Sequence, residues 1–123
     1  MRKLEEIFEL LDGIIPATAE KTIMFCEVEK TSYEIYYYSF YEGELIKHSS
    51  EIIDSGELDP SAIENGFGKI ADFIRNSDSY NSGLRNVITI KVEGTTEKVE
   101  TKHYDKSVGL YKIKKDWKLT HIS

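Results

Sequence analysis

Two neighbouring segments decide the fold of this chain: TIMFCEVE at residues 22–29 and SYEIYYYSF at residues 32–40. The first is mostly apolar and too short for a helix without caps. The second is crowded with aromatic residues around a central isoleucine, a composition typical of strands. Lys30 and Thr31 form a tight connection between them. The pair therefore predicts an antiparallel hairpin.

Alternation along the second segment divides its side chains between two faces of the hairpin. One face carries Tyr33, Ile35 and Tyr37, and the other carries Glu34, Tyr36, Tyr38 and Phe40. One face must pack under helices. We expect the other to leave Tyr36 and Tyr38 half-exposed beside Glu34.

The remaining pattern predicts an α+β fold. Apolar residues at helical spacing predict a first helix from Leu4 that ends near residue 12, and a second follows Asp59-Pro60, an N-cap with proline at the first helical position. Residues 45–48 suit a third strand, 49–60 read as polar turns, and 86–92 and 97–104 predict a second hairpin. Residues 107–123 suit a short helix or a turn leading to an edge segment. We expect one domain over residues 1–123, an antiparallel sheet of about five strands with the N-terminal and central helices packed on one face.

Composition excludes several classes of protein. No apolar run approaches the ~20 residues that a membrane helix needs, and the first residues, MRKLEE, lack the apolar core of a signal peptide. A single cysteine, Cys26, cannot form an internal disulfide. We therefore expect a cytoplasmic protein without membrane contact.

Charge is unevenly distributed along the chain. Residues 27–78 carry 12 acidic and 4 basic side chains, whereas residues 79–123 carry 5 acidic and 9 basic ones, within a net charge of −6. An acidic middle suits a basic partner, although ordinary solvation is the commoner reason for such charge when charge is taken alone. Net acidity argues against direct nucleic-acid binding, which needs clustered lysine and arginine.

No pattern of catalytic or ligating residues stands out. His48, His103 and His121 lie far apart and lack metal-ligand spacing, and no glycine-rich phosphate motif is present. Cys26 lies in an apolar strand, where cysteine behaves as a small hydrophobic residue rather than a nucleophile. We expect no enzyme activity, no metal and no cofactor.

The best candidates for binding are acidic and aromatic side chains. Six carboxylates fall within 18 residues and are relieved only by Lys47: Glu42, Glu44, Glu51, Asp54, Glu57 and Asp59. Such a strip would attract the phosphate-binding groove of a nuclease and speed association. Tyr36 and Tyr38 are candidate anchors, because tyrosine buries a large ring while its hydroxyl stays paired. A solvated loop and plain sheet packing remain the alternatives for these two sets.

The chain resembles the YezG-like family of bacterial immunity proteins, or antitoxins, over essentially its whole length. The resemblance lies in Pro16, Lys21, the strand ending Glu27-Val28, the aromatic strand 35–38, the strand 88–90, Tyr104 and Trp117-Lys118. Residues 17–19 depart from the family, which often has a tryptophan after the proline. The resemblance implies a protein that neutralises a cognate toxin domain, often a nuclease delivered by secretion or cell contact.

The sequence thus favours an immunity protein that binds a basic nuclease domain through the six carboxylates and the two tyrosines. One alternative is a small-ligand-binding or regulatory domain that uses the space between sheet and helices. Another is a nucleic-acid binder that uses the basic tail: Lys106, Lys112, Lys114, Lys115 and Lys118. An exposed tyrosine strand also leaves a homodimer open.

Overall fold

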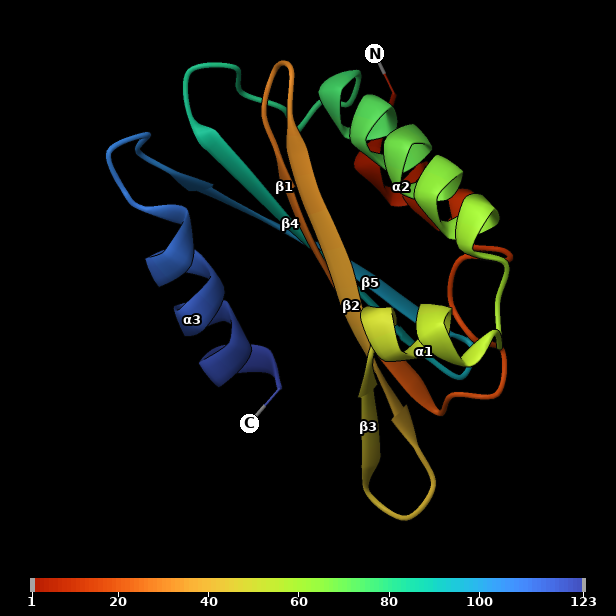
Figure 1. Ribbon diagram of the computed structural model, residues 1–123. Coiled ribbons are helices and arrows are strands. Elements are labelled where there is room, and N and C mark those ends of the chain that lie inside the picture. The colour runs from red at the N-terminus through yellow and green to blue at the C-terminus, as the bar shows by residue number, and fades with distance from the viewer. Residues whose placement is uncertain (1, 123) are drawn as a thin grey trace.

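Five strands form one sheet in the computed structural model, which describes residues 2–122 (Figure 1). The strands are β1 (Lys21–Val28), β2 (Tyr33–Tyr41), β3 (Leu45–His48), β4 (Arg85–Glu93) and β5 (Thr96–Tyr104). Their order is β3-β2-β1-β4-β5, and every neighbouring pair is antiparallel. The predicted α+β class, both hairpins and the third strand are confirmed.

Strand β1 lies at the centre of the sheet and is covered on both faces. Cys26 pairs with Ile35 of β2 and Ile88 of β4, and seven of the eight β1 residues are buried. An antiparallel strand with one solvated face would alternate apolar and polar residues. Burial on both sides explains why residues 22–28 are almost continuously apolar.

The first face of the sheet is covered by three short or medium helices. They are the 3₁₀ helix η1 (Leu4–Leu10), α1 (Ser49–Ser55) and α2 (Pro60–Arg75). The carboxylate of Asp59 accepts a hydrogen bond from the backbone N–H of Ser61 at 3.1 Å, so the predicted N-cap is present. At the other end, Arg75 donates to the carbonyls of Glu29 and Ser32 at 2.7 and 3.0 Å. These bonds fix α2 against the β1–β2 turn.

The segment after η1 packs closely against α2. A β-carbon at Gly66 would overlap the side chain of Ile14, whereas one at Gly68 would make only an ordinary contact, 3.7 Å from the Tyr33 hydroxyl. The buried Tyr37 hydroxyl donates to the carbonyl of Ile14 at 2.7 Å. Glycine at position 66 therefore permits this close approach of the Ile14 side chain, whereas the backbone conformation there does not call for glycine.

Helix α1 was not predicted, because residues 49–60 read as polar turns. A reciprocal cap begins it: the His48 ring accepts from Ser50 N–H at 3.1 Å, and the Glu51 carboxylate accepts from His48 N–H at 3.1 Å. Gly56 ends it with a φ of 77°, and Ile52 buries its side chain in the core. The missed signal was a capping box in which histidine replaces serine or threonine.

The tail forms α3 (Leu110–His121), a regular helix on the opposite face of the sheet from α2 (Figure 1). Ile113 and Trp117 are buried against the sheet, and the Trp117 indole N–H donates to the Thr89 hydroxyl at 2.9 Å. The helix among the two alternatives predicted for this tail is confirmed, whereas the expected edge segment is wrong. Leu110, Ile113 and Trp117 follow helical spacing and supply a second apolar layer. Helices therefore cover both faces, with only η1, α1 and α2 on the face predicted.

Candidate functional site: an acidic end and a basic groove

The six candidate carboxylates gather at one end of the molecule. Strand β3 and α1 lie side by side there, at the end of the sheet remote from the β1–β2 turn (Figure 1). Two of the carboxylates lie in the β2–β3 turn, two in α1 and two in the α1–α2 connection, and all are exposed: Glu42, Glu44, Glu51, Asp54, Glu57 and Asp59. We call this set the acidic end.

Three of the six carboxylates hold local structure. Glu51 and Asp59 cap helices, and Glu57 accepts hydrogen bonds from Thr18 and Tyr41 at 3.2 Å each. Within residues 2–122, Glu42, Glu44 and Asp54 make no hydrogen bond or ion pair. These last three are therefore the members available to a partner without cost to the fold.

Two apolar side chains lie exposed among these carboxylates. Leu45 is 51% exposed and Ile46 is 40% exposed, and both belong to the edge strand β3. Among residues 2–122, β3 pairs only with β2, and its other edge carries no strand. The sequence pattern predicted only a third strand at residues 45–48, and the exposure of its two aliphatic residues was not foreseen. Two adjacent aliphatic residues directly after a polar turn are a usable signal for such exposure.

Tyr36 and Tyr38 lie on the other face of the sheet, under α3, and are half-buried as expected. The Tyr36 ring stacks on Phe25 and on His48, with centroids 5.0 and 5.2 Å apart, and the Tyr38 ring stacks on Trp117 at 6.4 Å. These contacts make both tyrosines part of the second core. The structure thus places them on a different face from α1 and its carboxylates.

Helix α3 surrounds these tyrosines with lysines. The Lys114 ammonium lies 5.3 Å from the Tyr36 ring centroid, and the Lys118 ammonium lies 5.6 Å from that of Tyr38. Lys114 also pairs with Glu34 at 2.8 Å. From the sequence, only Glu34 was expected beside these tyrosines, because the placement of α3 could not be derived.

Glu27 is a buried carboxylate on the same face. It is 3% exposed, lies directly opposite Glu34 in the β1–β2 pair, and its Oε2 atom has no hydrogen-bond partner among the described residues. Burial, followed by repulsion from Glu29, raises the pKa of this carboxyl to about 7, although Arg85 opposes the change. Glu27 was not among the candidates chosen from the sequence. A single acidic residue within an otherwise apolar strand was the available sign that it is buried.

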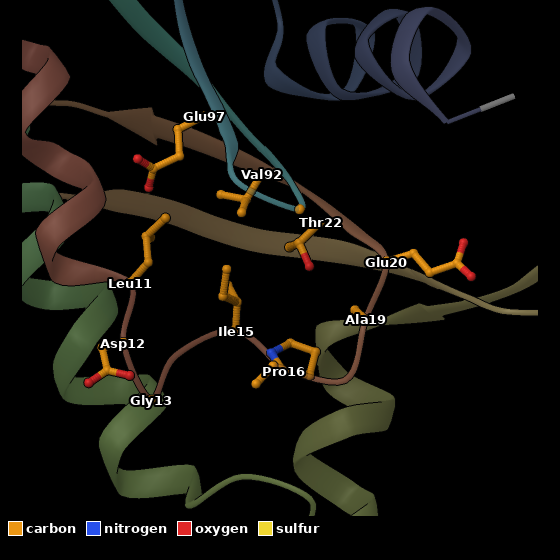
Figure 2. Close-up of a pocket in the computed structure, with 12 residues that line it drawn as sticks. Leu11, Asp12, Gly13, Ile15, Pro16, Ala19, Glu20, Thr22, Val92 and Glu97 are labelled. Atoms are coloured by element: carbon orange, nitrogen blue, oxygen red, sulfur yellow. The ribbon is translucent and has the colours of Figure 1, made fainter.

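A shallow pocket of about 300 Å³ lies between the segment after η1 and the end of the sheet (Figure 2). Leu11, Ile15 and Val92 form its apolar lining, and the carboxylates of Asp12 and Glu20 lie at its edge. Among residues 2–122, no group of three or more histidine, cysteine, aspartate or glutamate side chains is placed to hold a metal ion. An acidic rim alone identifies no ligand.

The cysteine and the remaining histidines make contacts that stabilise the fold. Cys26 is fully buried, and burial raises the pKa of its thiol far above the usual range, which disfavours the nucleophilic thiolate. His103 contacts the carbonyl of Ser79 at 2.8 Å, whereas His121 packs against Trp117. His48 and His121 thus pack on one aromatic cluster that includes Tyr38 and Trp117, and His103 contacts the backbone elsewhere.

Comparisons of the chain with protein-family models and with curated proteins find no match. Of the helices in residues 2–122, none has the length and apolar character needed to cross a bilayer.

Proposed function

We propose that this protein is an immunity protein, or antitoxin, that binds a cognate toxin domain and neutralises it in the cytoplasm. The partner class is a basic nuclease domain delivered by secretion or by cell contact. Two lines of support are the charge distribution of the acidic end and the resemblance of the sequence to the YezG-like family. The role requires binding and no catalysis.

The observation that carries the proposal is that Leu45 and Ile46, which project to opposite faces of the edge strand β3, are both exposed beside carboxylates that pair with no described residue. Interfaces commonly place a few apolar anchors at the centre and charged groups at the rim. Exposed apolar residues on a free strand edge also invite aggregation unless charge or a partner protects them. A partner that covers this edge accounts for both features.

Charge supplies the speed and the selectivity of the proposed complex. A nuclease presents a positively charged groove to its substrate, and surface carboxylates can occupy positions otherwise taken by phosphates. Complementary charge raises association rates strongly at low salt, while each exposed ion pair adds only about 0.2–1 kcal/mol of affinity. We therefore assign steering to Glu42, Glu44 and Asp54 and residence time to Leu45 and Ile46.

The test uses the toxin domain that the proposal expects to be encoded beside this gene, with association and dissociation rates measured at two salt concentrations. We expect the triple reversal E42K/E44K/D54K to slow association about tenfold or more at low salt, because rim charges act mainly on encounter. L45A should leave association unchanged and accelerate dissociation, since apolar anchors act on residence time.

A matched control reverses three exposed carboxylates outside the acidic end, Glu6, Glu9 and Glu64. This variant has the same net charge as the first triple variant. Association that slows equally in both would mean that total charge, rather than the acidic end, governs encounter. Unchanged rates for E42K/E44K/D54K and L45A would exclude this surface as the interface.

A further inference from the structure

A groove of about 590 Å³ runs between β2–β3 and α3, on the face opposite α2. Its walls combine aromatic rings with cationic side chains, contributed by Tyr36, Tyr38, His48, Tyr111, Lys114 and Lys118. The volume lies within the range of small-molecule sites, roughly 300–1,000 Å³. None of the six carboxylates of the acidic end lines this groove.

The charge of the groove opposes that of the whole protein. Lys114, Lys115 and Lys118 line it against a single carboxylate, Glu34, although the chain carries a net charge of −6. Glu34 pairs with Lys114 at 2.8 Å, which leaves Lys115 and Lys118 without a carboxylate partner in residues 2–122. The cationic excess therefore lies toward Lys118, one helical turn beyond Lys114.

The His48 ring adds a neutral donor to this cationic end. Its Nδ1 atom accepts from the backbone N–H of Ser50 at 3.1 Å, so the proton of the neutral ring sits on Nε2. No protein acceptor within residues 2–122 takes that Nε2–H. Burial lowers the pKa of His48, with Glu51 opposing the change and Lys118 and Lys114 adding to it, which favours the neutral form.

We propose that this groove binds a small phosphate-bearing ligand of the nucleoside phosphate class. The phosphate would lie against Lys118, Lys115 and the Nε2–H of His48, since ammonium and N–H donors bind phosphate oxygens through strong, charge-assisted hydrogen bonds. Tyr111 is 80% exposed at the mouth of the groove and offers a free ring face on which a base can stack. Glu34, at the other end, can accept a hydrogen bond from a ribose hydroxyl.

A small ligand suits this groove better than a long nucleic acid. Both faces of the Tyr36 ring are occupied, by Phe25 and by His48, so the sheet offers no row of free rings for successive bases. The net negative charge of the protein would also repel a long polyanion beyond the groove.

The test is a titration of the protein with ATP and with inorganic pyrophosphate at about 0.15 M salt, where charge effects beyond about 8 Å are screened. Binding is monitored by NMR chemical shifts and by calorimetry. We expect saturable binding, with shifts concentrated at His48 and along residues 111–118. K118M should weaken both ligands about fivefold or more, because it removes a direct charge-assisted contact. The control K112M removes the same charge from the same helix, where Lys112 pairs with Asp116 outside the groove; it should weaken binding less than about twofold.

A substitution at Tyr111 distinguishes recognition of the base from recognition of the phosphate. Because its side chain is largely exposed, Y111A should fold normally, weaken ATP about threefold or more, and leave pyrophosphate binding unchanged. No saturable binding of either probe at millimolar concentration would overturn the site. Equal losses in K118M and K112M would also overturn it, and equal ATP and pyrophosphate affinities in the parent protein would overturn the nucleoside assignment.

Discussion

Replacing Glu27 with glutamine should stabilise this protein, and the gain should depend on pH. Glu27 is 3% exposed in the central strand, faces Glu34 across the β1–β2 pair, and leaves its Oε2 atom without a partner among the described residues. Burial and the neighbouring carboxylates raise its pKa from 4.5 to about 7. Glutamine keeps the shape of the side chain and removes its charge.

The magnitude follows from that pKa. A difference between 4.5 and about 7, at 1.36 kcal/mol per pH unit, corresponds to about 3 kcal/mol. Below pH 4.5 the carboxyl is protonated in both folded and unfolded chains and costs nothing. As pH rises from 4.5 to 7 the unfolded chain ionises first, so the native state loses relative stability, and above pH 7 the full cost remains. The stability difference between E27Q and the parent should therefore grow over this window by up to about 3 kcal/mol.

Urea unfolding of both proteins at several pH values on either side of this window measures that difference. Any pH-independent free-energy cost of packing glutamine at this position shifts the whole curve of the stability difference against pH. It does not change how much that difference rises with pH. The control is E20Q, just before the same strand, where the exposed side chain should change stability by less than about 0.5 kcal/mol at any pH. A flat difference between E27Q and the parent from about pH 4 to about pH 8 would refute the reasoning.

Two further stability predictions come from the packing around Ile14. G66A should destabilise the protein by about 1–3 kcal/mol in chemical denaturation, because the new methyl group overlaps Ile14. The control G68A should be neutral or stabilising by up to about 1 kcal/mol, because alanine has the higher helix propensity. A G66A variant more stable than the parent would contradict the close approach of Ile14. Y37F should lower the free energy of unfolding by about 1–3 kcal/mol, since it leaves the buried Ile14 carbonyl without its donor, and the exposed control Y111F should change it by less than about 0.5 kcal/mol. Equal effects of Y37F and Y111F would exclude a stabilising role for the Tyr37 hydroxyl.

The sheet was predictable because its signals are local. Alternation in residues 32–40 assigns Ile35 and Tyr37 to one face and Tyr36 and Tyr38 to the other, and the pairing with β1 confirms this division. The Asp59-Pro60 start of α2 is equally local. Such features depend on backbone geometry within a few residues, which the sequence carries directly.

The second layer was not predictable in the same way. The stripe of Leu110, Ile113 and Trp117 suits a helix, but nothing in it says which face of the sheet the helix covers. That choice depends on long-range packing, here of Trp117 against Phe25 and Thr89. The basic groove is a consequence of this placement. The sequence therefore showed a lysine-rich tail but could not predict that its lysines lie beside Tyr36.

The acidic end shows an intermediate case. Its carboxylates are close in sequence, so their clustering was expected, and the structure adds that half of them serve as caps or bridges. The division depends on α1, which starts from the unusual His48 cap. Exposure of Leu45 and Ile46 also depends on β3 being the edge strand, an order that local patterns do not encode.

The most direct test of the proposed function is co-expression of this protein with the toxin domain that the proposal expects to be encoded beside its gene. Cell growth and nucleic-acid integrity are the readouts. We expect full protection and a stable co-purified complex with that domain, no protection against an unrelated toxin, and loss of protection with E42K/E44K/D54K combined with L45A. Cells that die equally with and without this protein, while their nucleic acid is degraded, would contradict the role of an immunity protein.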